Sequence, residues 1–564
     1  MGAFFRPRMH SMWFKVSAIL FCWSWTGLVM YLFVFDSNYL VFWTLLMAVI
    51  GAFGFQIVLL SGPSQTKLLY AETFAIFIGL QLLPIAYVGS SNVYETDAYY
   101  ELRATLDIMS RGWNPNLSLL GSVSAYPAVH IFTAQLSSLL GVQVFDVARW
   151  MGLLGHTVAF VFFLLFAGAL FRNPRVVLLS ALPVAFMFSF VMGSSFTRTS
   201  FSVGLFFLTL FLVARNYPAT NIRWTLLTFV STTATLFAHS LAPVVLAAFL
   251  VWALISRRVW IGRLRLSDRM SPRASTAERA PLVSPSLNFS VFTVVLVFAY
   301  FAFLGLWTQQ LLAATVLELA GVQPAAALGT GSGTPLYWRV FLYGQAIVGG
   351  AFVILILLKM KRKLEFVDFM LLSFAVLVTL WSLASYVLRI EFLRFTPFSW
   401  PFLLLAATNA GLETKRRRTT LLLVMALVVI NVAGYFPTTY DKNLAPAQGV
   451  WYTYINSMER AAVLDYNASG SLVGDWYINM AFLYLRNESV YTNSSFFLQG
   501  YASASSYSFL YLDTRDRNWI FTREAKPNGN PSVSDQLYRS YQETESMQRV
   551  YDNGGVEVYA ISGP

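Results

Sequence analysis

Runs of about twenty apolar residues recur along most of this chain, separated by short and often basic loops. As a helix, a run of this length is long enough to cross the hydrocarbon core of a bilayer. Charged residues make up 12% of the sequence. Soluble domains carry about twice that share, roughly 25%. The pattern predicts a polytopic, all-α membrane protein rather than a secreted or cytosolic one.

The apolar runs can be threaded through the plasma membrane with alternating direction, which predicts about 13 transmembrane helices. They cover residues 13–35, 39–60, 68–88, 145–170, 176–192, 199–214, 224–237, 241–255, 291–307, 340–358, 366–388, 398–410 and 421–435. With the basic N-terminus in the cytoplasm, every strongly basic short loop falls on the cytoplasmic side. The segment after the third run and the C-terminal part then lie outside the cell.

The formal net charge is +12, but the basic residues lie in loops between apolar runs. This location indicates membrane orientation and contact with membrane lipid, and it argues against binding to nucleic acid. The longest basic loop, residues 256–287, is expected to be cytoplasmic. Cys22 is the only cysteine, which excludes an intramolecular disulfide and a cysteine metal site.

A change of composition near residue 438 divides the chain into two predicted domains. Residues 1–437 form the transmembrane domain. Residues 438–564 contain no spanning run and alternate helical with strand-like stretches. Near the end, alternating residues flank Asp552-Asn553-Gly554-Gly555, a strong hairpin signal. We therefore expect a small extracytoplasmic α/β domain at the C-terminus.

The outer loop at residues 89–144 carries a pair of carboxylates, Glu95 and Asp97, among tyrosines. A carboxylate is the best available general base there for activating an acceptor hydroxyl. It could act alone or with a divalent metal, Mg²⁺ or Mn²⁺, held by Glu95 and Asp97. The alternative is a solvated loop charge, or a carboxylate that caps the helix after it. Asp97 begins that helix, so capping and catalysis are compatible.

Two shorter segments of the same loop, residues 99–109 and 126–140, are predicted to be helices in the membrane interface. Each is short for a span. The candidate contacts for an acceptor or a sugar in this loop are Tyr94, Tyr99 and Tyr126. An interfacial belt of aromatic side chains explains these tyrosines equally well.

The threading also places a set of cationic side chains outside, where cations are the exception: Arg198, Arg389, Arg394 and His239. Guanidinium groups can grip phosphate oxygens with two parallel hydrogen bonds, so the set is a candidate donor-phosphate site. The alternatives are snorkelling to lipid headgroups, surface pairs with Glu391, and a structural role for His239.

Several motifs resemble the GT-C superfamily of membrane glycosyltransferases. They are YETDAYYE, YPAVHIF and DVARWMGLLG, while FAHSLAP, EFLRFTPF and RVYDNGGVEVYA are similar to uncharacterised, mostly archaeal members. More distantly, the chain resembles protein O-mannosyltransferases, aminoarabinose transferases and oligosaccharyltransferases. The resemblance implies a GT-C-like arrangement of helices, a polyprenyl-phosphate-linked sugar as donor, Asp97 or Glu95 as catalytic acid of the first loop, and Arg394 near the donor phosphate.

Some features depart from the superfamily's pattern. The acidic loop follows the third apolar run rather than the first, which implies an extra N-terminal hairpin. The tail lacks a WWD-type signature, which disfavours en bloc transfer to asparagine. Residues 194–200 contain Arg198 but no second outer carboxylate, which favours a metal-independent mechanism.

These observations predict an inverting glycosyltransferase that moves a sugar from a polyprenyl-phosphate donor to a glycan, lipid or protein acceptor outside the cell. Asp97 would be the general base, and the outer arginines would hold the donor phosphate. One alternative is a glycan polymerase or ligase that uses a lipid-linked oligosaccharide. A transporter of lipid or glycan is disfavoured, because the predicted mid-span regions are nearly free of charge.

Overall fold

The described part of the computed structural model comprises helices, short connections and a small sheet. It covers residues 2–34, 39–88, 97–113, 126–191, 196–216, 221–270, 286–303, 336–362, 366–387, 396–414, 416–440, 457–465, 472–474, 482, 485–486, 508–513, 547–552 and 556–561.

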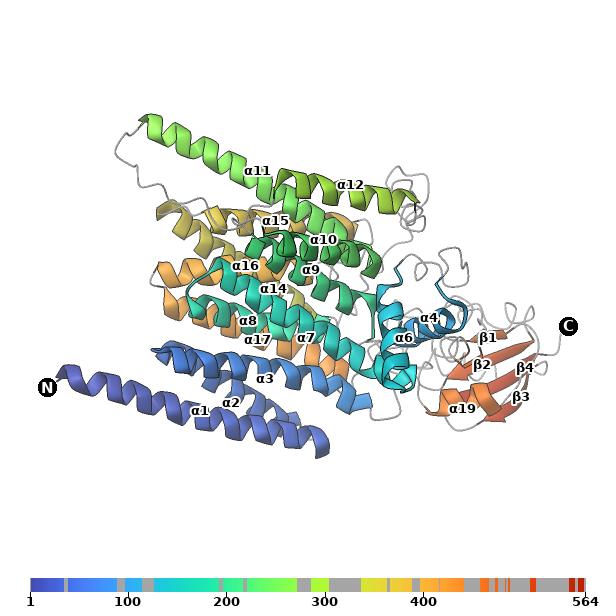
Figure 1. The fold of residues 1–564 in the computed structure, drawn as a ribbon. Helices are drawn as coiled ribbons and strands as arrows, with labels where there is room; N and C mark the ends of the chain where they lie inside the picture. Colours follow the sequence, from blue (N-terminus) through green and yellow to red (C-terminus); the bar gives the residue numbers. More distant parts are fainter. Residues whose placement is uncertain are drawn as a thin grey trace.

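Each apolar run predicted from the sequence coincides with a helix, and these helices form a bundle (Figure 1). They are α1 (Gly2–Val34), α2 (Tyr39–Leu59), α3 (Pro63–Val88), α7 (Val144–Leu170), α8 (Pro174–Val191), α9 (Arg198–Asn216), α10 (Ile222–Ala238), α11 (Leu241–Met270), α12 (Leu287–Phe303), α14 (Leu336–Arg362), α15 (Phe366–Val387), α16 (Thr396–Glu413) and α17 (Arg417–Tyr440).

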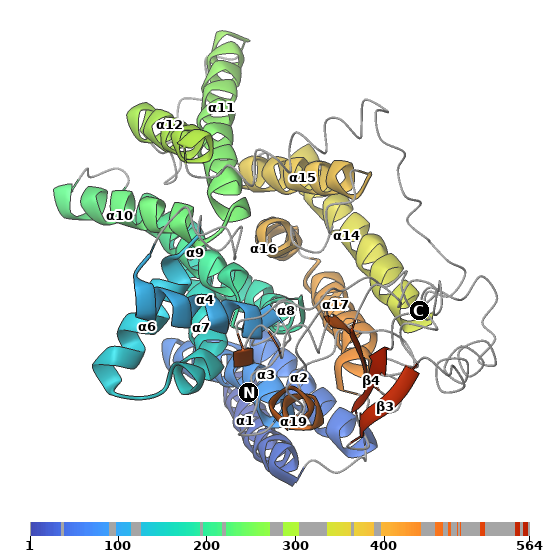
Figure 2. The same ribbon diagram turned by 90° about the vertical axis from the view of Figure 1, so that its right-hand side faces the viewer.

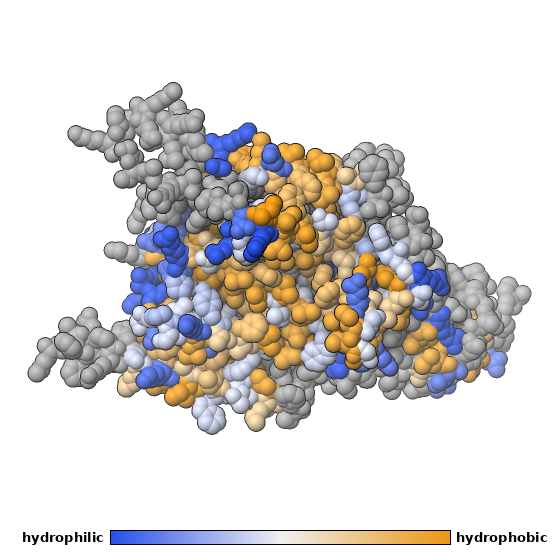
Figure 3. Space-filling view, in the orientation of Figure 1, coloured by the Kyte–Doolittle hydropathy of each residue, from blue (hydrophilic) through white to orange (hydrophobic). Residues whose placement is uncertain are grey.

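Five helical segments in the described part are long and apolar enough to cross a membrane, and several shorter apolar helices accompany them. The five are Ser11–Tyr31, Val144–Leu170, Arg198–Asn216, Leu241–Val259 and Tyr343–Lys361. Figure 3 shows hydrophobic side chains over the middle of the bundle and hydrophilic ones towards its two ends. The chain is therefore a helical membrane protein, while the count of about 13 spans stays a prediction.

Helices α7 and α9 approach each other closely at a point where two glycines meet. A Cβ atom on Gly204 would lie 3.0 Å from the carbonyl oxygen of Gly155. Small residues let helix backbones approach closely, which is how helices gain contact in a lipid environment. This contact fixes the axis of α9, and therefore the position of Arg198 at its first turn.

A cluster of polar side chains joins three helices near the end of the bundle that carries the predicted cytoplasmic loops. Lys359 of α14 forms ion pairs with Asp368 of α15 and, at 2.9 Å, with Glu413 of α16. The amide of Asn409 donates to the second Asp368 oxygen at 3.0 Å. Asp368 and Lys359 are both buried and cut off from water, so each compensates the charge of the other.

The opposite end of the bundle carries α4 (Asp97–Arg111) and α6 (Ala128–Leu140), which correspond to the two predicted interfacial segments. Figure 2 looks onto this end and shows the two helices in front of α7 and α9. Leu102 of α4 is buried, and the neighbouring Glu101 is buried too, because α6 and α9 cover it.

A four-stranded sheet lies beyond these helices, together with α19 (Ser457–Asp465) (Figure 1). Its strand order is β1-β2-β4-β3. The strands are β1 (Leu472–Gly474), β2 (Phe509–Asp513), β3 (Met547–Asp552) and β4 (Val556–Ile561). β3 and β4 pair antiparallel as the hairpin predicted from the sequence, and β1 pairs parallel with β2.

The sheet shares one hydrophobic cluster with α4, α6 and the start of α7. Tyr99 and Leu102 of α4 belong to it, as do Tyr511 of β2 and Val558 of β4. The extent of residues 438–564 as a separate extracytoplasmic domain stays a prediction.

Candidate functional site

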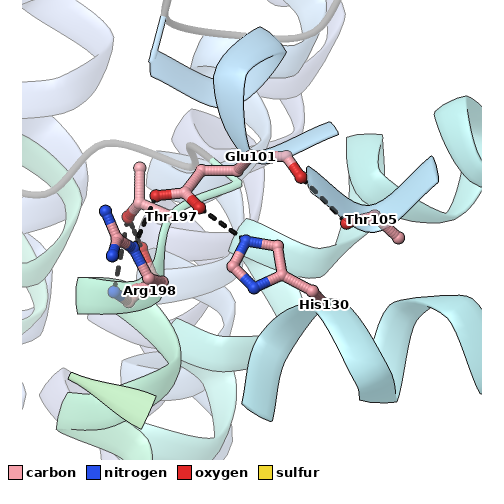
Figure 4. A network of polar contacts seen from close by, with 6 residues as sticks. Glu101, Thr105, His130, Thr197 and Arg198 are labelled. Carbon is pink, nitrogen blue, oxygen red and sulfur yellow. Dashed lines mark hydrogen bonds and ion pairs between the residues drawn. The ribbon is translucent and has the colours of Figure 1, made fainter. Parts of the chain in front are cut away.

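A buried ionic cluster joins α4, α6 and α9 at the end of the bundle that carries α4 and α6 (Figure 4). Glu101 of α4 is its centre. One carboxylate oxygen, Oε1, accepts from Arg198 Nε at 2.8 Å, and the other, Oε2, lies 2.6 Å from His130 Nε2. His130 belongs to α6 and Arg198 to α9, so one carboxylate fixes three helices relative to each other.

The local sequence explains why Arg198 stands at the start of a helix. Thr197 precedes α9, and its hydroxyl lies 3.5 Å from the backbone nitrogen of Ser200, the position of an N-cap acceptor. The two hydroxyls of Thr197 and Ser200 also lie 3.0 Å apart. The cap fixes the residue at which α9 begins. Arg198 therefore lies in the first turn of α9, where its side chain reaches Glu101.

Burial and charge oppose each other at Glu101. Burial alone would raise the pKa of the Glu101 carboxyl, but the positive charge of Arg198 and the hydrogen bond from His130 outweigh it. Together they lower the pKa of Glu101 to about 2. Glu101 is therefore ionised at neutral pH. Two protein partners take the place of the water that it has lost.

The imidazole of His130 is fully buried, and its two nitrogens are in different situations. Nε2 faces a carboxylate oxygen that can only accept, so Nε2 carries a proton. Nδ1 is buried without a hydrogen-bond partner among the described residues. The ring of Phe196 packs edge-on against the imidazole, with ring centres 6.4 Å apart. His130 is thus held in place by one hydrogen bond and by aromatic packing.

Asp97 is the first residue of α4 and precedes Glu101 by four positions. In an α-helix this spacing places two residues on the same face, one turn apart. The backbone of the candidate general base is therefore fixed by the same helix that Glu101 ties to α6 and α9.

Two further predicted residues, His239 and Tyr126, lie in a different environment from this cluster. His239 follows α10, and its Nδ1 accepts from the backbone N–H of Leu241 at 3.0 Å. Tyr126 is buried, with ring centres 6.4 Å from His239 and 6.0 Å from Tyr300. The described contacts of both residues join helix ends.

Tyr99 is also buried, within the hydrophobic cluster shared with the sheet. The other predicted site residues, Tyr94, Glu95, Arg389 and Arg394, lie outside the described residues. Of the predicted set, the described part of the chain therefore brings Arg198 and the start of α4 together through Glu101.

Glu101 and His130 were not predicted as site residues. A signal for Glu101 exists in the sequence, because it lies one helical turn after Asp97. For His130, the signal is only its place in the segment YPAVHIF.

The part of the chain that the structure describes contains no cluster of three or more His, Cys, Asp or Glu side chains suited to a metal. The cluster at Glu101 is a salt bridge rather than a set of metal ligands, because Arg198 already occupies one oxygen of the carboxylate. A divalent metal stays a prediction for Glu95 and Asp97.

No protein-family model and no curated protein sequence matches this chain. Among solved structures, the oligosaccharyltransferase of Archaeoglobus fulgidus, in complex with Zn and sulfate, is similar with a TM-score of 0.46 and 13% identity. The similarity covers 87% of this chain and 72% of that one.

ArnT from Cupriavidus metallidurans in the apo state is similar with a TM-score of 0.34 and 13% identity. This similarity covers 88% of this chain and 99% of that one.

Proposed function

We propose that this membrane protein is an inverting glycosyltransferase that uses a polyprenyl-phosphate-linked sugar at the outer face of the membrane. The observation that carries the proposal is the ion pair between Glu101 and Arg198. It ties the helix that begins with Asp97, a candidate base, to the helix that begins with a candidate phosphate ligand. A base and a phosphate ligand held in fixed relation are what a transfer from a phosphate-linked donor requires.

In the proposed reaction, Asp97 takes the proton of an acceptor hydroxyl. The hydroxyl oxygen bonds to the anomeric carbon of the donor sugar from the face opposite the phosphate. The bond between that carbon and the phosphate oxygen breaks, and the electron pair leaves with the polyprenyl phosphate. Inversion at the anomeric carbon follows from this single displacement, and the phosphate needs no strong acid to leave.

The pairing with Glu101 decides what Arg198 contributes. Because the negative charge of Glu101 compensates the guanidinium, Arg198 adds little net positive charge to the site. Its side chain is only 16% exposed, so its orientation is set before a donor arrives. In this proposal Arg389 and Arg394 supply the net charge that balances the donor phosphate, and Arg198 supplies an oriented N–H donor.

The proposal is tested by Asp97→Asn in purified protein incubated with labelled polyprenyl-phosphate sugars. Loss of a general base should lower the rate of transfer by roughly 10²–10⁴-fold. Asp107→Asn is the matched control, because Asp107 lies on the same helix but pairs with Arg103 at 2.8 Å. Near-normal transfer by Asp97→Asn, with unchanged elution and thermal unfolding, would remove Asp97 from this role.

The same assay can identify the class of donor and test whether transfer requires a divalent metal. A panel that includes lipid-linked oligosaccharides separates a single-sugar transferase from a polymerase or ligase. A parallel series with a chelator tests whether a divalent metal on Glu95 and Asp97 is needed.

A further inference from the structure

The corner between α6 and α7 exposes large apolar side chains. Leu139 is 84% exposed and Leu140 62% exposed, and Val142 follows them. The corner is a defined turn. Gly141 adopts a positive φ of 65°, Val142 N–H donates to the Ser137 carbonyl at 3.3 Å, and the Ser137 hydroxyl donates to the Val142 carbonyl at 2.6 Å. The fold therefore holds these leucines outward.

A groove of about 530 Å³ lies directly beside this corner. Six of its nine lining residues are apolar: Leu102, Leu106 and Met109 of α4, and Val142, Val144 and Phe145 of the corner and the start of α7. The groove has no charged residue in its lining. This composition favours a hydrocarbon chain over a sugar or a phosphate as the occupant.

The position of the corner relative to the membrane follows from α7. This helix is one of the candidate spans, and it begins at Val144, two residues after Val142. The outward-facing residues Trp150 and Leu154 continue along α7 from the corner. The exposed Asp146 of the first turn lies between the corner and Trp150 on this face, so the corner and the lipid-facing surface of α7 are two neighbouring apolar patches separated by one helical turn.

Contiguous exposed apolar side chains mark a surface that contacts another apolar phase. Of the possible occupants, a membrane lipid is the one supplied by the neighbouring surface of α7. We propose that the α6–α7 corner is seated among the acyl chains of the outer leaflet, and that the groove beside it holds one acyl chain of a membrane lipid.

The seated corner has a consequence for α4. Leu102, Leu106 and Met109 line the groove from one face of α4, while Glu101 of the same helix holds Arg198. An acyl chain in the groove therefore keeps α4 at a fixed height above the hydrocarbon. This inference does not depend on the proposed glycosyl transfer, because it concerns only where the surface meets lipid.

The test uses the full chain with its single native cysteine replaced, Cys22→Ser. Single cysteines carry an environment-sensitive fluorophore in Leu139→Cys, at the corner, and in Met109→Cys, in the groove. Leu154→Cys of α7 is the lipid-facing control, and Gln548→Cys of β3 is the control on the sheet. The proteins are placed in phosphatidylcholine vesicles, with or without phosphatidylcholine that carries a nitroxide on its acyl chain.

We expect the nitroxide lipid to quench the Leu139 and Met109 labels as strongly as the Leu154 label, and several-fold more strongly than the Gln548 label. Quenching at Leu139 no stronger than at Gln548 would overturn the seating of the corner. Quenching at Leu139 without quenching at Met109 would overturn the acyl chain in the groove. Because no sugar donor is present, either result leaves the proposed transferase activity untouched.

Discussion

Glu101 accepts a hydrogen bond of 2.8 Å from Arg198, a residue 97 positions later in the chain. The same carboxylate lies 2.6 Å from His130, so its two oxygens are shared between α6 and α9. Taking a carboxylate and a guanidinium out of water costs several kcal/mol for each ion, and their mutual attraction must repay that cost. The pair is therefore sensitive to the loss of either partner.

Replacing Glu101 by alanine should destabilise the protein by roughly 3–5 kcal/mol, because Arg198 is left without its compensating charge. Thermal unfolding in detergent measures the loss. Asp552→Ala is the control, because Asp552 forms an exposed pair with Arg549 at 3.0 Å on the sheet. Exposed pairs contribute about 0.2–1 kcal/mol, so the control should unfold near the wild-type temperature. Equal losses in the two variants would contradict a buried role for Glu101.

The dependence of stability on pH should carry the signature of Glu101. Its pKa in the folded protein, about 2, lies below the ordinary value of 4.5. The ionised form therefore stabilises the fold above pH 4.5, and this contribution is lost as the pH falls from 4.5 towards 2. Thermal unfolding at stepped pH should show this loss in the wild type and a weaker one in Glu101→Gln. Identical profiles would show that other groups govern acid unfolding.

Arg198→Lys keeps a positive charge but loses the planar fork of N–H donors. If Arg198 orients the donor phosphate, the KM for the donor should rise on the order of tenfold, equivalent to about 1.4 kcal/mol, with little change in the KM for the acceptor. A purely structural role would lower the yield of folded enzyme and leave the donor KM unchanged. Kinetics at varied donor concentration separate these outcomes.

The contact between α7 and α9 predicts a contrast between two glycines. A side chain at Gly204 would meet the backbone of Gly155, whereas a Cβ on Gly168 of α7 meets nothing within 4 Å. Gly204→Val should therefore cost typically 1–3 kcal/mol by overpacking, and Gly168→Val much less. Thermal unfolding compares the two. A smaller loss for Gly204→Val than for Gly168→Val would show that α7 and α9 are not in close contact.

The helices of the bundle could be predicted because each is encoded locally. A long apolar run needs only its own hydrogen bonds and a nonpolar environment to become a helix. The hairpin of β3 and β4 was likewise signalled by its turn, Asn553-Gly554-Gly555. The parallel pairing of β1 with β2 had no such signal, since the two strands are separated by more than thirty residues.

The candidate site could be predicted only in part. The threading placed Arg198 and the start of α4 on one face, and the two lie at one end of the bundle. Burial of Glu101 could not be foreseen from α4 alone. Its partners come from residues 29 and 97 positions away, and only the packing of α6 and α9 brings them together.

The hydrophobic cluster shared by α4 and the sheet sets an order of events during synthesis. The ribosome completes the membrane helices before it reaches β2 and β4, which supply Tyr511 and Val558. Until those strands emerge, the cluster that contains Tyr99 and Leu102 of α4 lacks the side chains supplied by the sheet. A nascent chain therefore has its membrane helices before its candidate site is complete. A nonsense mutation before residue 509 would leave the membrane helices in place but remove the strands that pack against α4.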